Sequence, residues 1–86
     1  MKKQASPQVT AAILEAVDNQ LRDSNPPETT DTYNRLRASG HSDGEARRLI
    51  AVALSAEMYE MLKYKKNYSP ERYFDLLRKL PKLPWE

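Results

Sequence analysis

Eight consecutive residues near the middle of the chain, Leu49 to Ala56, carry no charge in a sequence of which 30% is charged. A helix on the surface of a small protein usually combines one apolar stripe with one charged face. Eight residues make just over two helical turns, so this segment has no charged face to turn toward water. It therefore predicts either the buried centre of the fold or a helix with one side covered by a second molecule.

The length and composition of the chain restrict its class. The 86 residues suffice for one domain, which we expect to span 1–86 with residues 1–5 and 81–86 as extended tails. The absence of cysteine excludes a disulfide framework and thiolate chemistry. The apolar runs fall far short of the roughly 20 residues that span a bilayer, and no apolar signal segment follows the first lysines. We therefore expect a cytoplasmic protein with no membrane partner and no cofactor.

Four helices are predicted from the residues at which helices start and stop. Each begins after a serine or asparagine that can cap free backbone N–H groups, and three have proline in the first turn. Ser42 and Glu45 form a reciprocal capping box, and Gly40 suits a left-handed turn that ends a helix. The predicted helices run from Ser6 to about Asp23, from Asn25 to Gly40, over roughly 43–65, and from Ser69 to Leu80.

These helices, together with the absence of a strand pattern, predict an all-α fold. The short linkers are typical of a compact four-helix domain, and the long third helix is expected at its centre. Pro81 ends the fourth helix and Pro84 follows closely, so residues 81–86 are expected to form an extended, proline-rich tail.

Glu57 lies in the middle of the most apolar stripe of the third helix. A buried carboxylate without a partner costs several kcal/mol, so it must be paired, hydrogen-bonded or protonated. Arg72 or Arg48 is a candidate for the opposite charge, and tyrosine hydroxyls are candidate donors. One interpretation is a carboxylate in a small-ligand or catalytic site. The other is a structural anchor that ties the third helix to the fourth. The stripe comprises Ala46, Ile50, Ala53, Glu57 and Met61, within about 80° of one another.

The opposite side of the third helix is also mostly apolar and is the candidate partner face. Its small residues allow another helix to approach closely, and methionine adapts to varied packing. Two arrangements remain open: the first and fourth helices both cover the third within one monomer, or this face forms a two-fold homodimer interface. The face comprises Ala51, Ser55, Met58, Tyr59 and Leu62.

Basic and aromatic residues alternate at the end of the third helix, where Lys63, Lys65 and Lys66 accompany Tyr64 and Tyr68. Positive charge with stacking rings is typical of single-stranded nucleic-acid binding, and residues 78–82 add further positive charge. Lysines also suit the negative end of a helix dipole without any ligand. Nucleic acid is therefore an alternative partner.

His41 is the single histidine, in the turn between the second and third helices. It has no cysteine or second histidine at ligand spacing, so the sequence predicts no metal site. Neither a serine nor an acid near it suggests a catalytic triad, and we expect no catalytic residue and no enzyme activity.

Two resemblances can be recognised. The segment from Leu36 to Leu49 resembles the first helix, glycine-containing loop and second helix of ubiquitin-associated domains, through shared helix–loop–helix packing rather than ubiquitin binding. A wider segment, 25–84, is similar to a group of small bacterial proteins of unknown function, which implies a bacterial cytoplasmic origin and no particular activity. The matching residues are Asn25-Pro26-Pro27-Glu28, Gly40-His41-Ser42, Glu45-Ala46, Glu57-Met58-Tyr59, Tyr73 and Leu80-Pro81.

The sequence therefore favours a non-enzymatic helical module for protein interaction or oligomerisation. The alternatives are nucleic-acid binding through residues 63–68 and 78–82, and a ligand or catalytic site around Glu57.

Overall fold

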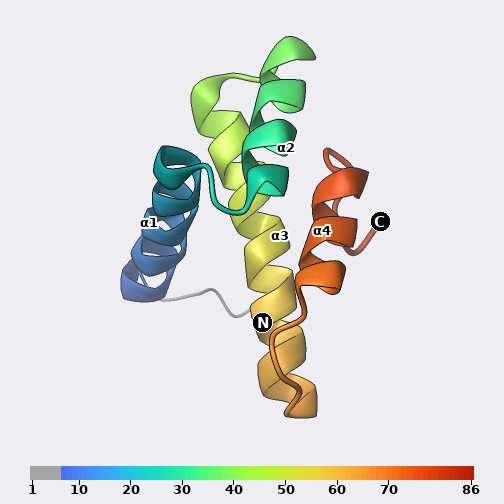
Figure 1. The fold of residues 1–86 in the computed structure, drawn as a ribbon. Helices are drawn as coiled ribbons and strands as arrows, with labels where there is room; N and C mark the ends of the chain where they lie inside the picture. Colours follow the sequence, from blue (N-terminus) through green and yellow to red (C-terminus); the bar gives the residue numbers. More distant parts are fainter. Residues whose placement is uncertain (1–6) are drawn as a thin grey trace.

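Four helices follow one another along residues 7–86, the part of the chain that the computed structural model describes. The all-α class is confirmed, and the third helix is the longest. The predicted Ser6 cap and the tail predicted for residues 1–5 lie outside the described residues. The helices are α1 (Pro7–Asp23), α2 (Pro27–Ala38), α3 (Asp43–Tyr64) and α4 (Pro70–Lys79) (Figure 1).

α3 is the central helix and packs against each of the other three. Figure 1 shows it running through the middle of the molecule, with α1 on one side and α4 on the other. Half of the uncharged stretch of α3 is buried at this centre, whereas the other half, Leu49, Val52, Ser55 and Ala56, is partly exposed. The buried apolar core comprises Ala46, Ile50, Ala51, Ala53 and Leu54 of α3 with Val17, Leu36, Tyr73, Leu77 and Leu80.

The start of α3 follows the predicted capping box. Ser42 Oγ accepts the backbone N–H of Glu45 at 3.1 Å, and the Glu45 carboxylate accepts the N–H of Ser42 at 3.1 Å. Just before it, Gly40 has the expected left-handed backbone, with φ of +102°. A side chain at this φ would be strained, so glycine permits the tight connection between α2 and α3.

The asparagine cap predicted for α2 is wrong. Pro26 occupies the capping position, and its side chain makes no hydrogen bond there. Asn25 belongs to the preceding turn, where its backbone N–H donates to the carbonyl of Gln20 at 3.0 Å. This backbone bond places Asn25 one residue too early to cap α2.

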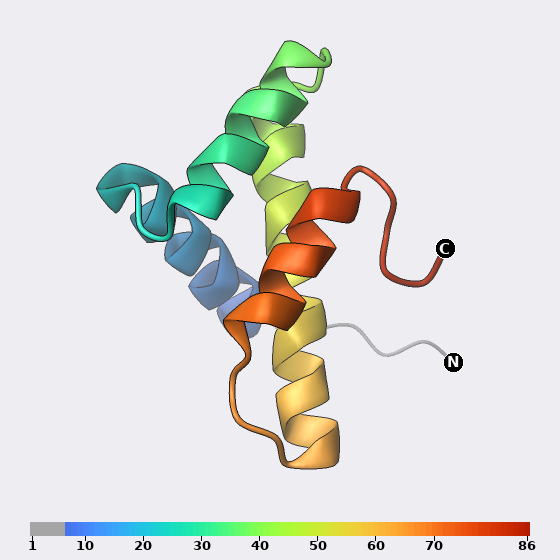
Figure 2. The same ribbon diagram turned by 45° about the vertical axis from the view of Figure 1, so that its right-hand side comes forward.

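The C-terminal end of α3 extends beyond the other helices (Figures 1 and 2). The chain turns back along α3 before α4 begins, so α4 covers the middle of α3 rather than its end (Figure 2). Lys65 ends the helix with a left-handed φ of +55°, and the N–H of Lys66 donates to the carbonyl of Met61 at 3.1 Å. Residues 61–66, called the α3 tip below, therefore contact few other parts of the fold.

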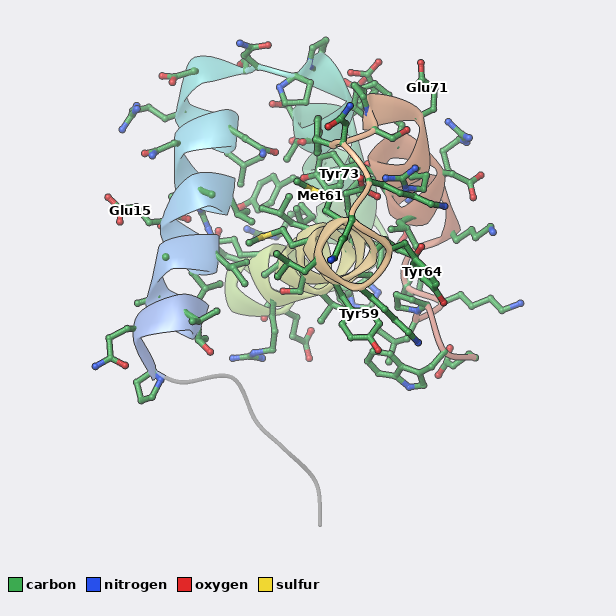
Figure 3. The ribbon with its side chains drawn as sticks, turned by 90° about the horizontal axis from the view of Figure 1, so that it is seen from below. Glu15, Tyr59, Met61, Tyr64, Glu71 and Tyr73 are labelled. Atoms are coloured by element: carbon green, nitrogen blue, oxygen red, sulfur yellow. The ribbon has the colours of Figure 1, made fainter. Side chains whose placement is uncertain are left out.

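A buried polar cluster joins α1, α2 and α4. The hydroxyls of Thr29 and Tyr73 both donate to Oε1 of Gln20, at 2.7 and 2.9 Å, and lie 3.2 Å from each other. In Figure 3, viewed along α3, Tyr73 and Met61 lie on the side of α3 that faces the other helices, whereas Tyr59 lies on the opposite side. The cluster satisfies the polar atoms of a wholly buried tyrosine.

The tail predicted as extended is instead folded into turns. The N–H of Lys82 donates to the carbonyl of Lys79 at 2.8 Å, and the N–H of Glu86 donates to that of Leu83 at 3.0 Å. The Glu86 carboxylate also accepts the N–H of Leu83 at 3.0 Å. Pro81 is the third residue of the first turn and Pro84 is the second residue of the next. Because proline occurs within turns as well as in extended segments, composition alone misidentified this segment.

Arg35 of α2 fixes the beginning of this folded tail. Its Nη1 donates to the carbonyl of Leu80 at 2.7 Å, and its Nη2 donates to the carbonyl of Leu77 at 2.9 Å. These carbonyls lie at the negative end of α4, where a cation is favourable. Arg35 thereby sets the direction in which the chain leaves α4.

Candidate functional site

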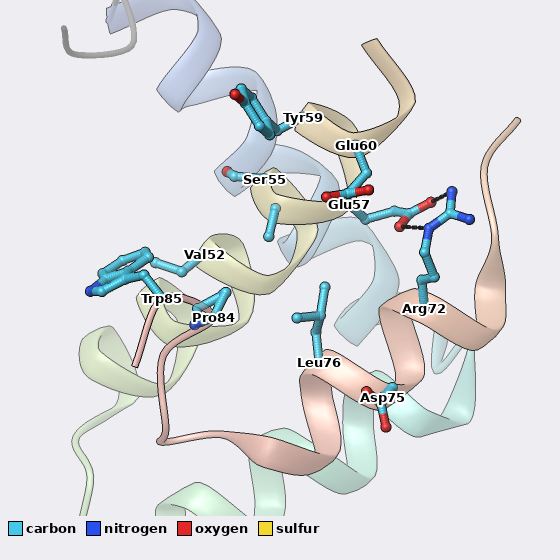
Figure 4. Close-up of a pocket in the computed structure, with 11 residues that line it drawn as sticks. Val52, Ser55, Glu57, Tyr59, Glu60, Arg72, Asp75, Leu76, Pro84 and Trp85 are labelled. Carbon is cyan, nitrogen blue, oxygen red and sulfur yellow. Dashed lines mark hydrogen bonds and ion pairs between the residues drawn. The ribbon is translucent and has the colours of Figure 1, made fainter. Parts of the chain in front are cut away.

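Glu57 is completely buried and is held by three hydrogen bonds. Oε1 accepts from Nε of Arg72 at 2.8 Å, and Oε2 accepts from Nη2 of Arg72 at 2.9 Å (Figure 4). Oε2 also accepts the backbone N–H of Ser69 at 2.8 Å. The carboxylate thus joins α3 to the linker and to the first turn of α4, with donors from an arginine and the backbone rather than from a tyrosine.

Arg72 is held from several directions. Its Nη2 also donates to the carbonyl of Asn67 at 3.0 Å, and its backbone N–H donates to Ser69 Oγ at 3.3 Å. The hydrogen bond to Glu57 raises the pKa of the Arg72 guanidinium, so the arginine stays charged. Of the two arginines expected as candidates, Arg72 is the partner of Glu57.

Tyr68 lies close enough to Glu57 for the carboxylate charge to act on its phenol. Burial, and then the negative charge of Glu57, raises the pKa of the Tyr68 phenol. Its ring centroid is 6.5 Å from that of Tyr73. Tyr68 therefore lies near the ion pair and packs toward Tyr73, and it does not donate to the carboxylate.

An open groove of about 1060 Å³ lies between α3, α4 and the C-terminal residues. Trp85 lies against Val52 at one end, and the pair of Glu57 and Arg72 closes the other (Figure 4). Two aromatic side chains border it: Tyr59 is 58% exposed and Trp85 is 72% exposed. The groove, called the α3–α4 groove below, is lined by Val52, Ser55, Ala56, Glu57, Tyr59, Glu60, Arg72, Asp75, Leu76, Pro84 and Trp85.

The acidic side chains of the groove differ in their partners. Asp75 pairs with Lys79 at 3.1 Å and Arg78 at 3.0 Å, and the hydrogen bond from Lys79 is the main cause of its lowered pKa. Glu60 has no ion pair within the described residues, although its charge contributes to the raised pKa of Arg72. The Glu57 charge is neutralised by Arg72, so Glu60 is the least compensated acid in the groove.

The predicted partner face is divided by the fold. Ala51 is buried in the core, so it is not available to a partner. Ser55 and Tyr59 line the groove. Met58 and Leu62 are 37% and 77% exposed and lie toward the end of α3. Of the predicted partner face, only Ser55 and Tyr59 therefore share one surface, the α3–α4 groove.

The lysines of the α3 tip lie against tyrosine rings. The Lys63 ammonium is 5.4 Å from the ring centroid of Tyr59 and 5.3 Å from that of Tyr64, and that of Lys66 is 5.4 Å from Tyr64. The two tyrosine neighbours, Tyr59 first, raise the pKa of Lys63. Within the described residues, neither Lys63, Lys65 nor Lys66 forms a salt bridge with an acid.

The two predicted basic segments are far apart. Residues 78–82 include and follow the last residues of α4, at the end of that helix that lies away from the α3 tip (Figures 1 and 2). Arg78 and Lys79 also share Asp75 as a partner. The fold therefore does not combine residues 63–68 and 78–82 into one basic track.

His41 lies beside a smaller hollow on the other side of Trp85. This hollow of about 410 Å³ is also lined by Leu49 and Val52. Nδ1 of His41 is 3.8 Å from the carboxylate of Glu45, and Arg48 lines the same hollow. The histidine packs at the turn between α2 and α3.

Sequence reasoning singled out Ser55, Glu57, Tyr59 and Arg72 of the groove. It missed the acids Glu60 and Asp75 and the apolar side chains of Leu76, Pro84 and Trp85. Trp85 lies in a tail that was expected to be extended, and its place beside Val52 depends on the turns that follow α4. A tryptophan close to the charged residues Lys82 and Glu86 of the tail was the one available signal.

Residues 7–86 contain neither a metal-binding cluster nor a membrane-spanning helix. No group of three histidine, aspartate or glutamate side chains there converges to hold a metal ion. No helix in the same range is long and apolar enough to cross a membrane.

Comparisons of the chain with protein-family models, with curated proteins and with solved structures gave no match.

Proposed function

We propose that this protein is a non-enzymatic interaction module that binds a helical segment of another protein chain in the α3–α4 groove. The observation that carries the proposal is the pair of exposed aromatic side chains, Tyr59 and Trp85, at the edges of a largely apolar groove. Tyrosine and tryptophan supply large contact areas and are the residues that most often dominate binding energy at interfaces.

The shape of the groove favours a helix as its occupant. Val52, Ala56 and Leu76 provide an apolar floor between two helices, and an amphipathic helix places its apolar stripe into such a groove. Burying the exposed part of Trp85 and Tyr59 would add the favourable transfer of apolar surface out of water. The polar groups at the ends then set the register of the bound segment.

The geometry of Glu57 supports a structural role over a catalytic one. A general acid or base needs an oxygen within reach of substrate, whereas both oxygens of Glu57 already accept hydrogen bonds and the side chain is wholly buried. We therefore assign Glu57 to positioning the α4 wall of the groove.

Nucleic-acid binding is less well supported. The lysines at 63, 65 and 66 remain available, but a strand of several nucleotides needs a longer basic track. The ammonium groups of Lys63 and Lys66 also lie over the tyrosine rings on which bases would stack.

Site-specific photocrosslinking tests the proposed function. A photoreactive amino acid replaces Ser55 in the groove, and a control protein carries it at Glu15, which points outward from α1 (Figure 3). In cells that produce the protein, we expect a discrete covalent adduct from position 55 and none from position 15. The absence of an adduct from position 55, or identical adducts from both, would contradict the proposal.

A further inference from the structure

One stripe of α3 runs from the groove onto the α3 tip. At 100° per residue, Val52, Ala56, Tyr59 and Lys63 lie within about 60° of one another. The first three line the groove, whereas Lys63 lies beyond it. The stripe is therefore walled by α4 and Trp85 along its first part and bare along its last part.

The bare part of this stripe is sterically accessible. The α3 tip projects past α1, α2 and α4, and the linker to α4 returns along the side of α3 that carries Glu57 (Figures 1 and 2). A second molecule can therefore lie along the Tyr59 side of the tip. Leu62, the most exposed of the large apolar side chains noted above at 77%, belongs to this tip. The projecting helix end and the open groove lie on the same stripe, so the helix end of one copy can fit the groove of another.

We infer that the segment held in the α3–α4 groove is the α3 tip of a second copy of this chain. This inference rests on the proposed function and names its partner. A two-fold axis beside Tyr59 places the two α3 helices antiparallel, so that each tip enters the groove of the other copy at the same time. Lys63 of one copy then lies opposite Ser55 of the other, since both are four residues from Tyr59.

The charges of the two surfaces agree with this arrangement. The groove carries Glu60 without an ion pair in the described chain, while the Glu57 charge is already neutralised by Arg72. The tip carries Lys63, Lys65 and Lys66, which likewise have no acidic partner there. In the antiparallel pair, the long side chain of Lys63 approaches Glu60 of the second copy, and symmetry creates this contact twice.

Charge reversal and mixing test the inference. The molar mass of the protein is measured by light scattering after size-exclusion chromatography, from about 5 to 500 µM at low salt. We expect the mass to rise from one chain toward two. Lys63→Glu and Glu60→Lys each juxtapose like charges twice, and each should weaken association by about tenfold or more.

Mixing the two variants supplies the decisive control. In a mixed pair every reversed contact again joins opposite charges, so the two-chain mass should return when Lys63→Glu and Glu60→Lys are combined. Lys82→Glu changes the net charge equally but lies beyond α4, and it should associate like the parent. Circular dichroism of each variant verifies that it is folded.

The remaining outcomes separate this inference from the proposed function. A one-chain mass up to about 500 µM, or a two-chain mass that neither reversal weakens and mixing does not restore, would overturn the inference. If the photocrosslink at Ser55 then gives an adduct of a different mass, the groove binds another protein and the proposed function stands. If it gives no adduct, both fall.

Discussion

The guanidinium of Arg72 meets the buried carboxylate of Glu57 through two hydrogen bonds of 2.8 and 2.9 Å. This pair joins the central helix to the first turn of α4, which forms one wall of the α3–α4 groove. The same carboxylate holds the N–H of Ser69, the residue that caps α4. The position of the groove wall therefore depends on one acid of α3.

Removal of either charge should destabilise the fold. Glu57→Gln places an amide among three donors and should lower the free energy of unfolding by about 1–3 kcal/mol. Arg72→Ala should lower the melting temperature further, because it leaves a carboxylate buried without its counter-charge. Thermal unfolding followed by circular dichroism measures both.

Arg78→Ala is the matched control for the arginine, since Arg78 pairs with Asp75 at the surface of the same helix. It should change the melting temperature little. Equal melting temperatures for the two alanine variants would contradict a structural role for Arg72. A Glu57→Gln variant as stable as the parent would contradict the role of Glu57 as the anchor between α3 and α4.

Tyr73 should make the fold sensitive to alkali. Burial is the main cause that raises the pKa of its phenol from 10.0 to about 12. Between these values the folded state keeps a proton that the unfolded state releases. The contribution of the protonated Tyr73 phenol to the free energy of unfolding is therefore complete below pH 10. It is lost as the pH rises toward 12, at up to about 1.4 kcal/mol per pH unit. Urea unfolding from about pH 8 to pH 11 measures this decline.

Tyr73→Phe provides the comparison for that titration. It removes the hydroxyl that Gln20 and Thr29 share, so the variant should be less stable than the parent at about pH 8. Its stability should fall less steeply above pH 10, because the titrating group is gone. The same steepness in both proteins would assign the decline to other residues.

Arg35 should stabilise the end of α4. Arg35→Ala removes the donors for the carbonyls of Leu77 and Leu80 and should cost about 1–2 kcal/mol, or roughly 5–10 °C in melting temperature. Arg37→Ala, two residues along α2, removes a contact with the hydroxyl of Tyr33 at the surface and should cost less. Equal losses of stability in the two variants would mean that the contacts of Arg35 with the two carbonyls contribute no more than the surface contact of Arg37.

Trp85 should report on occupation of the groove. It is the single tryptophan and is 72% exposed, so its fluorescence should initially be that of an indole in water. As the protein concentration rises from about 5 to 500 µM, we expect the emission to shift to shorter wavelength because the second copy covers the ring. A constant emission spectrum alongside a doubled mass would place the interface elsewhere.

The helices were predictable because their signals are local. Ser42, Glu45 and Gly40 act within a few residues of their own positions, so capping and glycine conformation can be inferred from spacing. The apolar stripe around Glu57 was likewise visible in a helical projection. The need of the Glu57 carboxylate for a partner followed from the cost of burying a charge.

The groove was not predictable for the opposite reason. Trp85 reaches Val52 through turns whose direction Arg35 sets from 45 residues earlier in the chain, at Leu80. The partner face was divided because packing in the core buries Ala51, whereas α4 leaves the end of α3 uncovered. Such long-range contacts have no local sequence signal, and the turns of the tail resemble an extended segment in composition.

A pair of glutamate substitutions tests the central claim, that two copies associate through the α3–α4 groove, most directly. Tyr59 and Val9 are 58% and 46% exposed, but Tyr59 lines the groove, whereas Val9 lies on α1, outside both the groove and the α3 tip. Light scattering should give the parent and Val9→Glu a mass that rises toward two chains, and Tyr59→Glu a mass of one chain at about 500 µM. A parent that remains a single chain, or equal effects of the two substitutions, would contradict the claim.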